Sequence, residues 1–322
     1  MRETFYDVAA LGEVLIDLTQ TGKNENGDPV FAANPGGAPA NVLAMLSRLG
    51  RRCAFLGKAG RDSFGDHLAG ILSGSGIDTA GLCRDDAVPT TLAVVHTLPG
   101  GDRDFSFYRS PGADMTLRPE ELDRRILSRC RVFHFGSLSL TDEPCRSATH
   151  EAVALARSAG AMISYDPNLR PPLWPDDQTA RQQIEWGLAQ CDILKIADNE
   201  LRFVCPEDDP DRAAETLMRR FPNVHLMNVT CGADGSRAYC SGLRVFVPAF
   251  RLGSVIDTTG AGDAFCGCVL DYVLAHGLNA LCETDLREML RFANAAGYLV
   301  STKRGAIRSM PDRSAIEAVL SS

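Results

Sequence analysis

A run of small residues beside an acid is the part of this 322-residue sequence best suited to chemistry. Residues 257–265 have the sequence DTTGAGDAF and lead directly into an apolar run. This pattern predicts a loop entering a helix, whose first N–H groups lack intrahelical partners and attract an anion. Gly260, Ala261 and Gly262 would let that anion approach the backbone. A carboxylate there repels phosphate, so Asp263 either takes a proton from a nucleophile or simply caps the helix.

A second glycine-rich stretch, NPGGAPAN at residues 34–41, also precedes a predicted helix. The apolar residues at positions 42, 45, 46 and 49 follow helical spacing, and a glycine at position 50 ends the helix. The adjacent Gly36 and Gly37 would let the backbone come near a ligand. Asn41, on the first turn, is either an ordinary helix-start residue or a hydrogen-bonding partner for sugar hydroxyls.

From residue 131 onward, short apolar runs alternate with helical patterns. This alternation predicts a mostly parallel sheet covered by helices on both faces, with ligands at the carboxyl ends of the strands. The candidates at such ends are the DPNLR segment from Asp166 to Arg170, Lys195, and Thr230 with the turn TCGADG, which contains Gly232 and Gly235.

Residues 90–109 interrupt this alternation with two extended runs around PGGD at 99–102, which is typical of a hairpin. Together with residues 13–32 the hairpin would form a small separate sheet that covers a site, with Tyr108 and Arg109 available to a ligand. The alternative is an ordinary hairpin at the edge of the main sheet.

The composition narrows the class of protein. The net charge of −8 argues against a nucleic-acid partner, and the 45% apolar and 23% charged fractions are those of a globular protein. The eleven cysteines include no CxxC metal-type pair, so we expect them to be reduced in a cytoplasmic protein. We expect no signal peptide and no membrane span.

These motifs together resemble the ribokinase-type (PfkB) carbohydrate kinases, over nearly the whole chain. The matching strings are GEVLID, NPGGAPANV, GKAGRDSFG, VTCGADG, DTTGAGDAF and FANAAG followed by KRGA. Within the family the sequence is most similar to fructokinases, through FYRSPGADM, SYDPNLRPPLWP and ILKIADNE. The resemblance implies one ribokinase-like domain over residues 1–322: a three-layer α/β/α sandwich with a β-sheet lid formed by residues 13–33 and 90–110.

The resemblance also implies ATP-dependent transfer of a phosphoryl group to the 6-hydroxyl of fructose. Asp263 would be the general base, and the Gly260–Gly262 turn would bind the transferred phosphoryl group. The matching sugar positions are Asp17, Gly36, Gly37, Asn41, Arg109 and Arg170. The matching nucleotide positions are Lys195, Thr230, Gly232, Gly235 and, beside the adenine, Asn294.

Two kinds of metal ion are implied by the same resemblance. Asp257 would hold a monovalent cation, usually K⁺, together with Gly305 and Ser309, although it could equally cap the helix. Glu200 is matched to Mg²⁺ handling, but here Ala197 stands where relatives often carry an Asn.

Three further possibilities stay open. A 2-keto-3-deoxygluconate kinase would use the same chemistry on an acidic substrate, for which Arg109 and Arg170 could supply positive charge. A sugar- or nucleotide-binding regulator would keep the fold without turnover. A homodimer could form through the lid.

Overall fold

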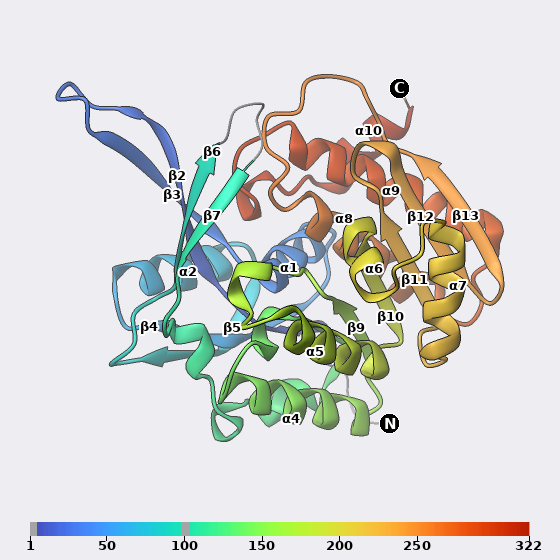
Figure 1. Ribbon diagram of the computed structural model, residues 1–322, viewed down its shortest axis with the longest axis horizontal. Coiled ribbons are helices and arrows are strands. Elements are labelled where there is room, and N and C mark those ends of the chain that lie inside the picture. The colour runs from blue at the N-terminus through green and yellow to red at the C-terminus, as the bar shows by residue number, and fades with distance from the viewer. Residues whose placement is uncertain (1–4, 98–102, 322) are drawn as a thin grey trace.

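A central sheet of nine strands organises the computed structural model, which describes residues 5–97 and 103–321 (Figure 1). The strand order is β13-β12-β11-β10-β9-β8-β1-β4-β5; pairing is parallel from β11 to β5, and β12 and β13 are antiparallel. The strands are β1 (Tyr6–Leu11), β4 (Cys53–Gly60), β5 (Ile77–Asp85), β8 (Cys130–Gly136), β9 (Met162–Asp166), β10 (Ile193–Ala197), β11 (Leu226–Thr230), β12 (Gly235–Cys240) and β13 (Leu243–Pro248).

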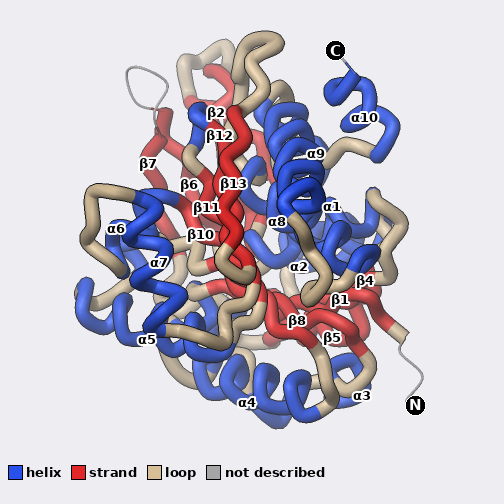
Figure 2. Tube along the Cα trace, turned by 90° about the vertical axis from the view of Figure 1, so that its right-hand side faces the viewer, coloured by secondary structure: helices blue, strands red, loops and turns tan. Residues whose placement is uncertain are grey.

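Helices cover both faces of this sheet, and each face has its own apolar core. One face packs against α1 (Ala38–Arg48), α2 (Ser63–Gly74), α8 (Ala261–His276), α9 (Glu283–Ser301) and α10 (Arg313–Ser321). The other packs against α3 (Arg124–Leu127), α4 (Cys145–Ser158), α5 (Asp177–Gln190), α6 (Asp198–Val204) and α7 (Pro210–Arg220). Figure 2 shows the strands between α8 and α9 on one side and α6 and α7 on the other. This confirms the expected three-layer α/β/α fold.

Short 3₁₀ helices complete the connections: η1 (Ala113–Thr116), η2 (Pro119–Glu121), η3 (Leu138–Leu140), η4 (Pro171–Leu173), η5 (Gly232–Asp234) and η6 (Ile307–Ser309).

The parallel strands are apolar because both of their faces are covered; all eight residues of β4, for example, are buried. Within the described ranges, no helix combines the length and apolarity needed to cross a bilayer.

A second sheet of four strands, ordered β3-β2-β6-β7, stands apart from the first and projects from the body beside β4 and α2 (Figure 1). It consists of β2 (Leu15–Lys23), β3 (Pro29–Gly36), β6 (Leu92–Thr97) and β7 (Arg103–Tyr108). These strands come from the two segments expected to form the lid, and the hairpin is not on the edge of the main sheet. The predicted turn at 99–102 lies outside the described residues. That the second sheet acts as a lid stays a prediction.

Candidate active site

Asp263 lies in the first turn of α8, as the glycine pattern predicts. Gly260 precedes the helix with a left-handed φ of 83°, and a Cβ there would lie 2.8 Å from the Cβ of Ala306. Only glycine fits both conditions without strain. The sharp turn brings the buried carboxylate of Asp263 to the N-terminal end of a 16-residue helix.

Asn41 on α1 is the direct partner of this carboxylate, because its Nδ2 donates to Oδ2 of Asp263 over 2.7 Å. The Oδ1 atom of Asn41 is buried and finds no hydrogen-bond partner in the described part of the chain. Gly37 sets the start of α1 with a φ of 118°, and a Cβ there would lie 2.3 Å from the carbonyl oxygen of Glu13. The two glycine-rich stretches of the sequence therefore meet side by side, with one acceptor beside the acid ready for a hydroxyl.

Lys195, at the carboxyl end of β10, supplies positive charge to the same place. Its Nζ lies 3.0 Å from Oδ2 of Asp166 on the neighbouring β9 and would lie 3.2 Å from a Cβ on Gly262. Burial by itself would lower the pKa of Lys195, but the carboxylates of Asp166, Glu200 and Asp263 raise it overall. Lys195 thus stays protonated beside the turn, where an anion would bind.

Burial raises the pKa of Asp263 above that of an ordinary aspartate. The hydrogen bond from Asn41 and the positive charges of Lys195 and Arg170 act in the opposite direction, and Glu200 adds to the rise. A carboxylate with a raised pKa is a better proton acceptor, which suits a general base.

The N–H groups of the glycine turn differ in availability. Ala261 donates its N–H to the carbonyl of Thr258 over 3.1 Å. No acceptor among residues 5–97 and 103–321 takes the N–H of Gly260 or Gly262. The backbone donors open to an anion are therefore those of the two glycines, and Ala261 contributes the geometry of the turn.

The expected nucleotide loop is a tight turn between β11 and β12. The N–H of Cys231 donates to the carbonyl of Gly235 over 2.8 Å, and Thr230 ends β11. Gly232 has a φ of 53° and Gly235 a φ of 125°, and a Cβ at Gly235 would lie 2.2 Å from the carbonyl oxygen of Val247. The backbone therefore favours glycine at both positions, and a Cβ on Gly232 would meet no atom within 4 Å.

Asn294 on α9 has its amide occupied. Its Oδ1 accepts from the hydroxyl of Ser236 over 2.8 Å, and its Nδ2 donates to the carbonyls of Val247 at 3.1 Å and Pro248 at 3.3 Å. Asn294 therefore ties α9 to β12 and β13, the strands that follow the expected nucleotide loop.

Asp257 lies close to the segment it was expected to share with a cation. Its Oδ1 accepts from the N–H of Thr259 over 2.8 Å, and its Oδ2 accepts from the N–H of Gly305 over 3.4 Å. Ser309 is buried and donates its hydroxyl to the carbonyl of Ala306 over 2.8 Å. The structure thus brings one buried carboxylate close to the Gly305 segment, and both of these backbone partners are N–H donors. A monovalent cation at Asp257 stays a prediction.

Glu200 uses both carboxylate oxygens on the backbone. They accept from the N–H of Leu169 over 2.6 Å and of Ala197 over 2.8 Å. Within the described residues, no group of three or more His, Cys, Asp or Glu side chains could hold a metal ion. The carboxylate of Glu200 therefore joins the loop after β9 to the start of α6, and its expected part in Mg²⁺ handling stays a prediction.

Two of the expected sugar residues, Asp17 and Arg170, lie near other residues of the site. Asp17 on β2 faces Gly36, where a Cβ would lie 2.5 Å from Oδ2 of Asp17. The positive charge of Arg170 acts on Asp263. Arg170 also donates to the carbonyl of Leu169 over 3.1 Å. Arg109 was expected to be available to a ligand, but this expectation is wrong. Its guanidinium is buried in an ion pair with Asp114. Tyr108 beside it is 68% exposed.

Two residues with clear contacts in the structure, Glu13 and Asp114, were not among the expected candidates. Asp166 belongs to the expected Asp166–Arg170 segment, because it ends a predicted strand, but no role was assigned to it. Glu13 and Asp114 form their bonds with residues distant in sequence or in an irregular segment, and no local pattern marks them.

The model of the pfkB family of carbohydrate kinases matches residues 6–313. The chain belongs to this family. It is 45% identical over 307 residues to a probable fructokinase-2 of Arabidopsis thaliana, covering 94% of this chain and 92% of that protein. It is 44% identical over 306 residues to fructokinase-1 of Zea mays, covering 94% of each. This confirms the resemblance, including the expected similarity to fructokinases.

Solved structures agree with this family assignment. A fructokinase from Xylella fastidiosa with bound ATP superposes with a TM-score of 0.89 at 32% identity, covering 98% of this chain and 99% of that one. A fructokinase double mutant from Vibrio cholerae, with fructose, ADP and a potassium ion bound, gives a TM-score of 0.87 at 28% identity, covering 99% and 100%. The chain is therefore a sugar kinase of the fructokinase type.

Proposed function

We propose that the protein transfers the γ-phosphoryl group of ATP to the 6-hydroxyl of D-fructose. The observation that carries this proposal is the carboxylate of Asp263, held by Asn41 at the N-terminal end of α8 beside a glycine turn with open N–H groups. An acid next to an anion-binding turn suits a reaction in which a hydroxyl loses a proton while it attacks a phosphate.

The reaction follows from these positions. Asp263 takes the proton of the sugar hydroxyl as its oxygen forms a bond to the γ-phosphorus of ATP, while the bond to the β–γ bridging oxygen breaks and ADP leaves. The N–H groups of Gly260 and Gly262 donate to the transferring group, and Lys195 adds positive charge nearby. Such preorganised donors stabilise charge that develops in the transition state.

The sugar would lie between the small sheet and the start of α1. Asp17 and the Oδ1 of Asn41 are acceptors for its hydroxyl groups, and Arg170 balances the charge of Asp263. The missing side chains of Gly36 and Gly37 leave room for Asp17 and for the carbonyl of Glu13. The nucleotide would lie along the Thr230–Gly235 turn. The bound fructose, ADP and ATP of the two solved fructokinases support this pair of substrates.

Two ions complete the proposal. Mg²⁺, bound through the ATP phosphates, would neutralise their charge. A K⁺ held by Asp257 with backbone groups near Gly305 and Ser309 would neutralise that carboxylate and order the turn that contains Gly260; the potassium ion of the Vibrio cholerae fructokinase supports this choice. The remaining proposals are a cytoplasmic location and dimerisation through the small sheet.

The decisive variant is Asp263→Asn, which keeps the shape of the side chain and removes the base. We expect kcat to fall by about 10²- to 10⁴-fold, the usual contribution of a general base, while fructose binding measured by calorimetry persists. Asp271→Asn is not a suitable control, because Asp271 is buried between two arginines. The suitable control is Asp198→Asn, since the side chain of Asp198 is 42% exposed. Retained turnover in Asp263→Asn refutes the base assignment.

A substrate panel of fructose, ribose, 2-keto-3-deoxygluconate and adenosine tests the sugar. An acidic substrate is not favoured, because Arg109, one of the two cations expected to receive it, is already paired with Asp114. Turnover of the keto acid without turnover of fructose would overturn the proposal. A non-catalytic regulator would bind fructose and ATP but form no sugar phosphate.

A further inference from the structure

A buried ion pair lies at the base of the small sheet, where β7 returns to the body of the protein. Arg109 follows β7, and its Nη2 and Nε lie 2.6 and 2.7 Å from Oδ2 of Asp114 in η1. The two side chains are only 2% and 1% exposed. Arg109 also donates to the carbonyl of Leu138 over 2.9 Å and to the hydroxyl of Thr141 over 3.0 Å. The end of β7 is thereby fixed to the segment that follows β8.

Thr91 connects the same carboxylate to the other end of the hairpin. Its hydroxyl donates to Oδ1 of Asp114 over 2.5 Å, and its carbonyl accepts from the N–H of Ile16 over 3.1 Å. Thr91 directly precedes β6, and Ile16 directly precedes Asp17 on β2. A continuous chain of contacts therefore runs from Arg109 through Asp114 and Thr91 to the strand that carries Asp17.

The segments before β2 and after β3 are also linked to each other, near the positive charge of Arg109. Glu13, just before β2, accepts from the N–H of Ala38 over 2.8 Å, just after β3. Burial raises the pKa of Glu13, and the positive charge of Arg109 acts to lower it. The entry and exit points of both hairpins of the small sheet thus converge on one buried group of charges.

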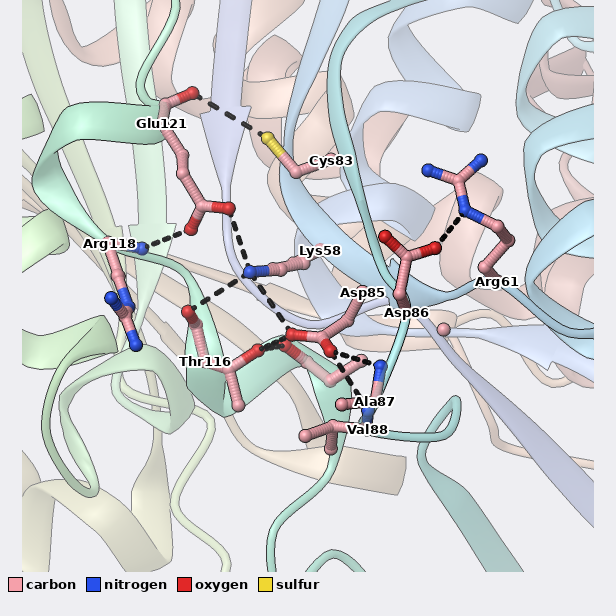
Figure 3. A network of polar contacts seen from close by, with 12 residues as sticks. Lys58, Arg61, Cys83, Asp85, Asp86, Ala87, Val88, Thr116, Arg118 and Glu121 are labelled. Carbon is pink, nitrogen blue, oxygen red and sulfur yellow. Dashed lines mark hydrogen bonds and ion pairs between the residues drawn. The ribbon is translucent and has the colours of Figure 1, made fainter.

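A second set of contacts holds the flanking segments from outside (Figure 3). Lys58 on β4 lies 3.1 Å from Oδ2 of Asp85 and 2.8 Å from Oε1 of Glu121. Asp85 accepts from the N–H of Val88 over 2.9 Å, before β6, and from the hydroxyl of Thr116 over 2.7 Å, after β7. These outer contacts, made by Lys58, Asp85 and Glu121, restrain the segments before β6 and after β7. The inner contacts, made by Arg109, Asp114 and Thr91, reach the ends of the strands themselves.

We propose that Thr91, Asp114 and Arg109 are positioning residues, which hold the small sheet so that Asp17 meets the sugar. Arg109 acts through Asp114 and Thr91 and does not touch the substrate. This inference rests on the proposed function in one respect, namely that Asp17 binds the sugar. Disturbing the inner contacts then weakens sugar binding and leaves the chemistry at Asp263 and the nucleotide turn intact.

The matched pair Thr91→Val and Thr91→Ser tests this. Valine keeps the shape and removes the hydroxyl, whereas serine keeps the hydroxyl. We expect T91V to raise the KM for fructose about tenfold, equivalent to about 1.4 kcal/mol, with kcat and the KM for ATP close to wild type. T91S should restore the wild-type KM. An unchanged fructose KM in T91V, or equal impairment in T91S, overturns the proposal. T91A removes the same hydroxyl with less bulk, so it should raise the fructose KM as T91V does, and an unchanged KM there also overturns the proposal.

Hydrogen exchange of the ligand-free protein provides a readout that needs no substrate. In T91V we expect faster exchange in residues 15–23 and 92–97 and unchanged exchange in α8 and β11. Arg61→Met is the control, because it removes an exposed ion pair with Asp86 close to the same connection. Unchanged exchange of the small sheet in T91V refutes the positioning role. A wild-type protein inactive on fructose refutes the proposed function instead, and the exchange result still decides this inference.

Discussion

The side-chain amide of Asn41 and the carboxylate of Asp263 share a hydrogen bond of 2.7 Å although 222 residues separate them in the chain. The bond joins the first turn of α1 to the first turn of α8, the two helices that follow the glycine-rich stretches. It fixes the direction of the acid and stabilises its ionised form, so both the geometry and the pKa of the proposed base depend on it.

Replacing Asn41 by Ala is expected to raise the pKa of Asp263 further, because the hydrogen bond that lowers it is lost. The base must be ionised to accept a proton, so activity falls as the pH drops through its pKa. We therefore expect the acidic limb of the kcat profile to move upward by about one pH unit, the equivalent of about 1.4 kcal/mol from a bond to a charged group.

Asn223→Ala is the control for this profile. The side-chain amide of Asn223 donates hydrogen bonds as that of Asn41 does, but its acceptors are the carbonyls of Leu188 and Cys191 and not a carboxylate. Its acidic limb should coincide with that of the wild type. If the limb of N41A does not move, Asn41 does not set the pKa of the base.

Gly260→Ala should impair the reaction more than Gly277→Ala, although both glycines flank α8 with nearly equal φ values of 83° and 82°. Gly260, with a ψ of −4°, is left-handed and costs an alanine about 1 kcal/mol. Gly277, with a ψ of 150°, lies in a region nearly restricted to glycine, so alanine there costs about 1–3 kcal/mol of stability, far from the turn. Only at Gly260 does the new Cβ also approach Ala306, to 2.8 Å, so the turn must shift. We expect about a hundredfold loss of kcat in G260A, as for the loss of an oxyanion donor, and nearly full activity in G277A. Equal kcat values would contradict the assigned turn.

Glu13→Gln should change how stability depends on pH. Burial raises the pKa of Glu13 to about 7, above its ordinary value of 4.5. The folded state therefore holds this proton more firmly, and its contribution to stability is complete below pH 4.5 and is lost as the pH rises through 7. Glutamine does not titrate, so E13Q should gain on the wild type by at most about 3 kcal/mol between pH 4 and 8. Urea unfolding at both pH values measures this, and a constant difference would argue against a raised pKa.

Potassium dependence should disappear with Asp257. We expect the wild type to lose activity when K⁺ is replaced by Na⁺ or by a bulky organic cation, because the carboxylate beside the glycine turn is then not neutralised. Asp257→Asn should be slow in every salt, whereas Asp198→Asn, at a partly exposed position, should respond to K⁺ like the wild type. Wild-type activity that does not depend on the cation would remove this site from the proposal.

The sequence by itself determined the features that depend on neighbouring residues. The run GAGD predicts a helix start with open donors because the glycines and the helix dipole act within one turn, and α8 begins there as expected. Alternating apolar runs predict the layered sheet, since burial on both faces requires apolar strands. Lys195 and Thr230 could be named because carboxyl ends of parallel strands share one edge.

Only the tertiary structure decided which side chains meet. Asp166 and Lys195 come together because β9 lies beside β10, and Asn41 reaches Asp263 because α1 packs against α8. Arg109 appeared from the sequence to be free for a ligand, yet the fold buries it against Asp114. Such pairs join segments whose strand order and helix packing no local periodicity specifies. The desolvation that shifts the pKa values of Glu13 and Asp263 likewise exists only once the chain has folded around them.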